Sequence, residues 1–109
     1  NDYVHRDIRW PNIIMVSEFS FLMIDFEFAG IANTPMDIHE YIFNYMVAYN
    51  DNYQKNHDLE LVGKLVEDWA STNNKELDTN ANNFVTSMKH ENSSVSDALE
   101  HIWLQNTPI

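Results

Sequence analysis

The 109-residue sequence predicts a single, mainly α-helical domain that also contains one short β-hairpin. Two observations lead to this fold class. Residues 13–16 and 21–24 are short apolar runs separated by four residues, a spacing that suits a hairpin. Further along the chain, apolar residues recur at intervals of three and four, as they do on one face of a helix.

The chain is strongly acidic, with 6 Lys and Arg residues against 17 Asp and Glu and a formal net charge of -11 at pH 7. This charge excludes binding to nucleic acid through neutralised phosphates. Because 44% of the residues are hydrophobic, the sequence is not that of a disordered polyanion. The absence of cysteine excludes disulfides and thiolate metal sites, and the two glycines exclude a glycine-rich phosphate-binding loop.

After the hairpin, the first expected helix covers residues 37–49. Asp37 is a good N-cap for it, with Glu40 three residues further on. The second expected helix covers residues 58–70. Its apolar residues lie on more than one face, so we expect it to be buried on several sides.

Two further helices are expected towards the end of the chain. Ala81, Phe84, Val85 and Met88 predict the third. The fourth covers residues 96–104 and is expected to direct four side chains inward, those of Ala98, Leu99, Ile102 and Trp103.

Three side chains with carboxylate or amide oxygens flank the hairpin. Asp7 and Asn12 precede it and Asp25 follows it. Because a hairpin brings its two ends together, these oxygens are expected to converge. Such oxygens suit Mg²⁺, and a further carboxylate beside a metal site can orient an attacking hydroxyl group.

The segment His5-Arg6-Asp7-Ile8-Arg9-Trp10-Pro11-Asn12 resembles the HRDxxxxN catalytic loop of the protein-kinase superfamily. After one hairpin, Asp25-Phe26-Glu27 stands where that family has its DFG motif. The resemblance implies that Asp7 is the catalytic base that accepts the proton of a substrate hydroxyl group. It also implies that Asn12 and Asp25 are ligands of the Mg²⁺ ions that bridge the phosphates of ATP.

The same resemblance implies roles for four other residues. Arg9 would stand near the transferred phosphate, where serine/threonine kinases usually have Lys, and would supply the same charge in a forked shape. His5 and Arg6 would be structural members of the loop. Asp58, in a segment similar to the DxWSxG helix of kinases, would hold the backbone of the catalytic loop from below.

The resemblance extends to residues 98–104, which are similar to the ALxHPWL closing helix, so it spans nearly the whole chain. Residues 1–109 are therefore expected to be a partial protein kinase domain, a C-lobe that begins at the catalytic loop. The N-lobe, with its glycine-rich loop and strand Lys, would lie upstream in the same polypeptide. The 109 residues alone should be nearly inactive, because half of the nucleotide cleft would be absent.

The sequence also departs from the protein-kinase pattern. Glu27 replaces the glycine of DFG, and residues 24–30 resemble the IDFEYAG stretch of the choline-kinase branch. In that branch a later Asp begins a helix, which makes Asp37 a competitor of Asp58 for the supporting role. The APE motif and the Arg that pairs with its Glu are missing, and Thr34 is the only Ser or Thr between Asp25 and Asp58.

Three functions follow as expectations. The first is an ATP-dependent, Mg²⁺-dependent Ser/Thr protein kinase whose partner is a protein or peptide hydroxyl substrate. The second is a pseudokinase or interaction module without catalysis, and the third is a small-molecule kinase of the choline or aminoglycoside type. An intracellular location, in the cytoplasm or nucleus, is expected, and no apolar run approaches the roughly 18 residues of a membrane-spanning helix.

Overall fold

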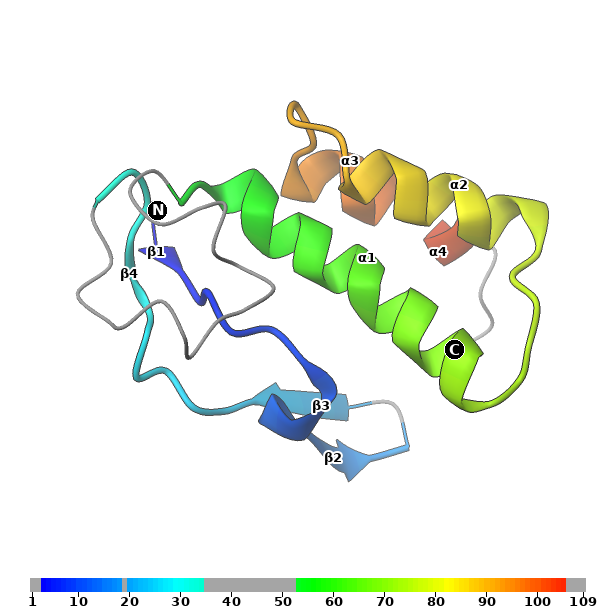
Figure 1. Cartoon of the computed structure of the whole chain (residues 1–109), viewed down its shortest axis with the longest axis horizontal. Helices are drawn as coiled ribbons and strands as arrows, with labels where there is room; N and C mark the ends of the chain where they lie inside the picture. The colour runs from blue at the N-terminus through cyan, green and yellow to red at the C-terminus, as the bar shows by residue number, and fades with distance from the viewer. Residues whose placement is uncertain (1–2, 19, 35–52, 106–109) are drawn as a thin grey trace.

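The computed structural model describes residues 3–18, 20–34 and 53–105. Within these residues the chain is a mixture of helices and small antiparallel sheets, with the long helix α1 between the strands and the other helices (Figure 1). The elements are β1 (Tyr3–Val4), η1 (Trp10–Asn12), β2 (Ile13–Ser17), β3 (Ser20–Met23), β4 (Gly30–Ile31), α1 (Lys55–Thr72), α2 (Thr79–Met88), α3 (Val95–Glu100) and α4 (Ile102–Gln105).

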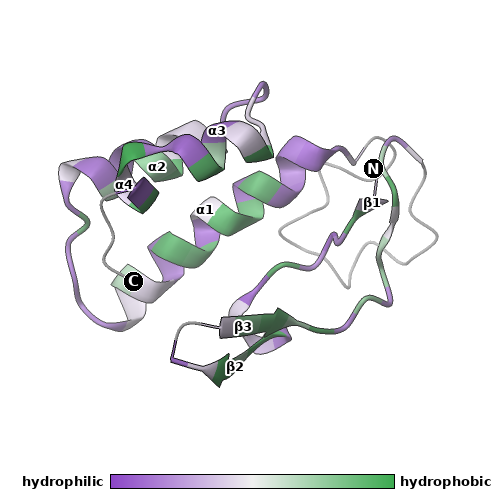
Figure 2. Ribbon diagram, turned by 180° about the vertical axis from the view of Figure 1, so that it is seen from behind, coloured by the Kyte–Doolittle hydropathy of each residue, from purple (hydrophilic) through white to green (hydrophobic). Residues whose placement is uncertain are grey.

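The predicted hairpin is confirmed as the antiparallel pair β2–β3. Ile13 pairs with Met23 and Met15 with Phe21, with an irregularity in the register before Ser17. The hairpin is strongly apolar (Figure 2) yet little covered. Its large exposed side chains are Ile14, Met15, Val16, Phe21 and Leu22.

A second antiparallel pair, β1–β4, was not expected from the sequence. Tyr3 pairs with Ile31 and Val4 with Gly30. Strands of two residues leave no alternation to detect, and their partners lie far apart along the chain. This pair places the residues that follow β1, including the predicted catalytic loop, beside the segment that contains β4.

Helix α1 contains the predicted second helix and begins three residues before it. Its first turn is closed by reciprocal contacts between Gln54 and His57, in which the His57 Nδ1 accepts the Gln54 N–H at 2.8 Å. The expectation of burial on several sides is confirmed, because α1 contributes to two separate apolar clusters.

The first cluster joins α1 to the strand region and consists of Val4, Ile8, Tyr53 and Leu61. The second joins α1 to the later helices and consists of Leu59, Phe84, Met88 and Ala98. Leu59 and Leu61 are two residues apart on α1, so one turn of the helix packs against the predicted loop with one face and against the later helices with another.

The predicted third helix is confirmed as α2, which begins at Thr79 with the Asp78 side chain accepting the Ala81 N–H at 2.8 Å. The prediction of a single fourth helix over residues 96–104 is wrong, because His101 has extended backbone dihedrals that separate α3 from α4. Instead of continuing the helix, its ring packs edge-on against Phe84, and its Nδ1 accepts the Trp103 N–H at 3.1 Å.

Of the four side chains that were expected to point inward, two do so and two do not. Ala98 is buried and Trp103 packs against Phe84 with ring centroids 5.0 Å apart, as the periodicity predicted. Leu99, within α3, is 62% exposed, and Ile102, which begins α4 after the break, is 54% exposed. The expected helix over residues 37–49 lies outside the described residues. None of the described helices combines the length and hydrophobicity needed to cross a bilayer.

Candidate functional site

The backbone of the predicted loop is fastened from below by the side chain of Asp58 in the first turn of α1. Its Oδ2 accepts the His5 N–H at 2.7 Å and its Oδ1 accepts the Arg6 N–H at 3.0 Å. The hydroxyl group of the fully buried Tyr53 donates to Oδ1 at 2.7 Å. Hydrogen bonds to a charged acceptor are stronger than neutral ones, so Asp58 fixes the loop firmly on α1.

Asp7 lies on this fastened loop and is 2% exposed. Its Oδ1 accepts from the Arg9 Nε at 3.0 Å and its Oδ2 accepts from the Asn12 Nδ2 at 2.9 Å. Both carboxylate oxygens of Asp7 are therefore held by side chains of its own loop. The Arg9 side chain is half exposed, whereas the Asp7 side chain that it contacts is only 3% exposed.

The His5 ring connects Asp7 to the far end of the hairpin. Its Nδ1 accepts the Asp7 N–H at 3.1 Å, which leaves Nε2 to donate to the Ile24 carbonyl at 3.0 Å. The ring also meets Phe26 edge-on, with centroids 4.9 Å apart. One buried imidazole thereby sets the positions of both the Asp7 backbone and the residue that precedes Asp25.

Arg6 directs its guanidinium group into the segment that contains β4. Its Nη1 donates to the Phe28 carbonyl at 3.1 Å, and its Nη2 donates to the Ile31 carbonyl at 3.1 Å and to both the carbonyl and the hydroxyl oxygen of Thr34 at 3.3 Å. The guanidinium carbon also lies 5.9 Å from the centre of the Tyr53 ring. Within the described residues its buried Nε has no acceptor.

Two backbone positions at the site have unusual conformations. Arg6 has φ 73° and Asp25 has φ 61°, in the left-handed region that side-chain-bearing residues seldom adopt. Such conformations persist only where surrounding contacts over-determine them, and they concentrate at functional sites. Here the contacts of His5, Arg6 and Asp58 supply that constraint.

Asn12 and Asp25 are the predicted metal ligands, and the structure brings their chain segments together. The Ile24 N–H donates to the Asn12 carbonyl at 2.8 Å, so Asp25 directly follows the residue bonded to Asn12. The Asn12 Nδ2 donates twice to Asp7, to its carbonyl at 2.8 Å and to its Oδ2. With both amide protons turned towards Asp7, the Asn12 Oδ1 is left as an oxygen donor, and Asp25, at the adjoining end of the hairpin, is exposed.

This donor set fits Mg²⁺. The ion takes oxygen ligands and is commonly held by one or two carboxylates together with substrate phosphates and water. No group of three His, Cys, Asp or Glu side chains suited to a metal is present in the described ranges. An ion held by Asn12 and Asp25 would therefore complete its coordination from the nucleotide and solvent.

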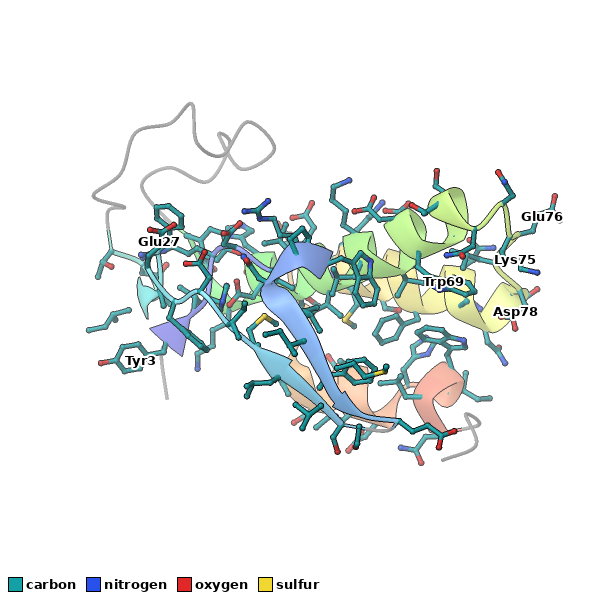
Figure 3. The ribbon with its side chains drawn as sticks, turned by 90° about the horizontal axis from the view of Figure 1, so that it is seen from below. Tyr3, Glu27, Trp69, Lys75, Glu76 and Asp78 are labelled. Atoms are coloured by element: carbon teal, nitrogen blue, oxygen red, sulfur yellow. The ribbon has the colours of Figure 1, made fainter. Side chains whose placement is uncertain are left out.

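The structure thus gathers His5, Arg6, Asp7, Arg9 and Asn12 on one loop over Asp58. Asp37, the competing candidate for the supporting role, lies outside the described residues. Glu27 is exposed and lies with Tyr3 at one end of the molecule, opposite the α1–α2 loop (Figure 3).

Two residues that support the site were not predicted from the sequence. Tyr53 lies between the expected helices over residues 37–49 and 58–70, in a polar stretch where only its aromatic character hinted at burial. The Trp10 Nε1 donates to the Leu65 carbonyl at 3.0 Å and so ties the outer turn η1 to the middle of α1. No periodic pattern signals either contact.

Comparison of the chain with protein-family profiles, with curated proteins and with solved structures gave no match.

Proposed function

We propose that this chain carries the catalytic half of an ATP-dependent phosphotransferase of the protein-kinase type, acting on a Ser or Thr hydroxyl group of a protein. The observation that carries the proposal is the position of Asp7. It is held by Asn12 and Arg9 on a loop whose backbone is fastened by the Asp58 carboxylate, with Asp25 at the adjoining end of the hairpin. The resemblance to the HRDxxxxN and DFG motifs supports the same assignment.

In this proposal Asp7 accepts the proton of the attacking hydroxyl group. The hydroxyl oxygen forms a bond to the γ-phosphorus of ATP, the bond between that phosphorus and the β–γ bridging oxygen breaks, and ADP leaves with the electron pair. Asn12 contributes by orienting Asp7 through its amide group. Arg9, half exposed and paired with Asp7, is placed to meet the charge of the transferred phosphoryl group.

The remaining residues position these groups. Asn12 and Asp25 would hold Mg²⁺, which neutralises charge on the phosphates. His5 links Asp7 to Ile24, so the loop and the end of the hairpin move together. Preorganisation of this kind accounts for most of the catalysis available to phosphoryl transfer, because the enzyme itself does little covalent chemistry.

The direct test is transfer of labelled γ-phosphate from Mg²⁺·ATP by the full-length protein to protein and peptide acceptors. Asp7→Asn keeps the shape of the side chain and removes the base, so we expect a loss of about 10²–10⁴-fold in kcat. Glu67→Gln is the matched control, because it removes an exposed carboxylate from α1 that pairs with Lys89. Equal activity of Asp7→Asn and the wild type would refute the assignment.

A second candidate is an interaction module without catalysis. The exposed apolar side chains of β2 and β3 favour it, since contiguous apolar surface often marks an interaction site. The melting temperature of the full-length protein with and without Mg²⁺·ATP separates the two, because a ligand that binds the native state raises its stability. A pure scaffold would show no shift.

The third candidate is a small-molecule kinase, which residues 24–30 favour because they resemble the IDFEYAG stretch of the choline-kinase branch. Glu27 is exposed and stands two residues after Asp25, so a second carboxylate follows the proposed metal ligand in the chain. Parallel assays with free amino alcohols and with peptides decide between the two acceptor classes. Transfer to amino alcohols alone would replace the protein-kinase proposal.

A further inference from the structure

A small cavity of about 180 Å³ lies between the proposed catalytic loop and the middle of α1. Apolar side chains and the stems of long charged ones form its lining: Ile8, Arg9, Leu61, Lys64, Leu65 and Asp68. Small-molecule sites usually enclose about 300–1,000 Å³, whereas a cavity of about 150 Å³ lined by apolar residues holds a group the size of benzene. The dimensions therefore suit one side chain rather than a whole ligand.

The cavity is adjacent to Asp7. Ile8 directly follows Asp7 in the chain, and Arg9 both lines the cavity and donates to the Asp7 Oδ1 at 3.0 Å. The opposite wall belongs to α1, which the Trp10–Leu65 hydrogen bond ties to the same loop. An acceptor whose hydroxyl group reaches Asp7 from the Arg9 side would therefore bring its neighbouring group to this cavity.

The charges at the rim are already compensated. Arg9 pairs with Asp7, which lies two positions before it in the chain. Lys64 pairs with Asp68, four positions after it, at 3.3 Å. A charged occupant would have to displace one of these partners, whereas an apolar occupant gains contact with Ile8, Leu61 and Leu65 at no such cost. The lining thus selects an uncharged, apolar group.

We infer that this cavity is a specificity pocket for an acceptor polypeptide, taking an apolar side chain of medium size, such as Leu, Ile or Met, next to the phosphorylated Ser or Thr. The inference rests on the proposed function and narrows its substrate class. It separates polypeptides from free amino alcohols, which have no apolar side chain to place there.

The test compares peptides that share one Ser and differ in its neighbouring residues. The wild-type protein should phosphorylate peptides with Leu, Ile or Met in the preferred position at least about tenfold more efficiently, in kcat/KM, than peptides with Ala or Asp. Leu65→Ala enlarges the pocket and should shift the preference to Phe and Trp. Leu65→Phe narrows it and should shift the preference to Ala. A structural role of Leu65 alone would lower the rate for all peptides alike.

Val66→Ala is the matched control, because it truncates the next residue of α1, which packs against the other apolar cluster. Melting temperatures establish that each variant is folded. This control should keep the wild-type preference. The role of the cavity as a specificity pocket would be overturned if the wild type showed no preference among the peptides. It would also be overturned if both Leu65 variants kept the wild-type preference.

Binding of Ser→Ala peptides, followed by fluorescence anisotropy without nucleotide, distinguishes failure of the pocket from failure of the proposed function. Size-dependent binding that follows the Leu65 variants, without phosphoryl transfer to any peptide, would support the pocket and count against the kinase assignment. Phosphoryl transfer to peptides whose binding does not depend on the neighbouring side chain would support the kinase assignment and count against the pocket.

Discussion

The carboxylate of Asp58 accepts the backbone N–H of His5 at 2.7 Å, across 53 positions of the chain. The same carboxylate accepts the Arg6 N–H and the Tyr53 hydroxyl group, so three donors converge on it. Two of these are backbone donors of a loop that has no regular secondary structure to satisfy them. One residue in the first turn of a helix therefore determines the shape of the loop that carries Asp7.

Asp58→Asn should reduce the free energy of unfolding by about 3 kcal/mol, because the amide has one acceptor oxygen for three donors and turns an N–H group towards one of them. Urea unfolding of both proteins measures the difference. The exposed Asp68→Asn, which loses only an i,i+4 pair with Lys64, should cost less than about 0.5 kcal/mol. Similar losses in the two variants would show that Asp58 does not have the proposed supporting role.

Gly30→Ala should be destabilising because of a close approach to Arg6. A Cβ at this position would stand 2.8 Å from the Arg6 Nη1, and four hydrogen bonds hold that guanidinium group in place. The expected loss in the free energy of unfolding is about 1–3 kcal/mol. In an Arg6→Met background the same substitution should cost much less, so a double-mutant cycle measured by denaturant unfolding should show strong coupling. Additive losses would argue against the clash.

Asn12→Asp should weaken the protein in a pH-dependent way. The new carboxylate would face the Asp7 carbonyl and Oδ2, where Asn12 now donates two hydrogen bonds. Like charges raise the pKa of one carboxyl of such a buried pair above its unfolded value. The folded variant then binds the extra proton, so its stability should rise as the pH is lowered from about 7 and fall as the pH is raised. Asn12→Leu should also lose stability, but without the added dependence on pH. Urea unfolding of both variants across the same pH range measures this difference.

His57, in the first turn of α1, makes the stability of the protein depend on pH. Burial lowers the pKa of His57 below its ordinary value of 6.5, against opposing contributions from Glu60 and Asp58. The folded protein therefore binds fewer protons at this site than the unfolded chain just below pH 6.5, and stability from His57 is lost as the pH falls through that range.

His57→Gln tests this link, because Gln can accept the Gln54 N–H in place of Nδ1 without titrating. The difference in free energy of unfolding between wild type and variant should move in favour of the variant between about pH 7.5 and pH 5. Parallel pH profiles for the two proteins would contradict the role of His57. The carboxylates common to both proteins cancel in this difference.

Local patterns predicted the elements that local forces determine. The apolar runs at residues 13–16 and 21–24 predicted β2 and β3, and three-four spacing predicted most of α1 and α2. The start of α1 was placed too late, because its first turn is closed by Gln54 and His57, a pair that does not match the usual Ser/Thr and Glu capping box.

Long-range features could not be predicted in the same way. The break at His101 depends on its contact with Phe84, which belongs to another helix. The supporting role of Asp58 was expected from the motif resemblance, but the burial of Tyr53 beneath the loop was not, because only the tertiary arrangement brings its hydroxyl group to Asp58.

Arg6 has a further consequence for the way the molecule opens. Its guanidinium group joins the loop to the carbonyl groups of Phe28, Ile31 and Thr34. Separation of the two segments would break all of these hydrogen bonds together and would leave the buried cation of Arg6 without its acceptors. Residues 5–12 and 28–34 should therefore exchange their amide hydrogens as one cooperative unit, so that partial unfolding would remove the whole site at once rather than loosen it residue by residue.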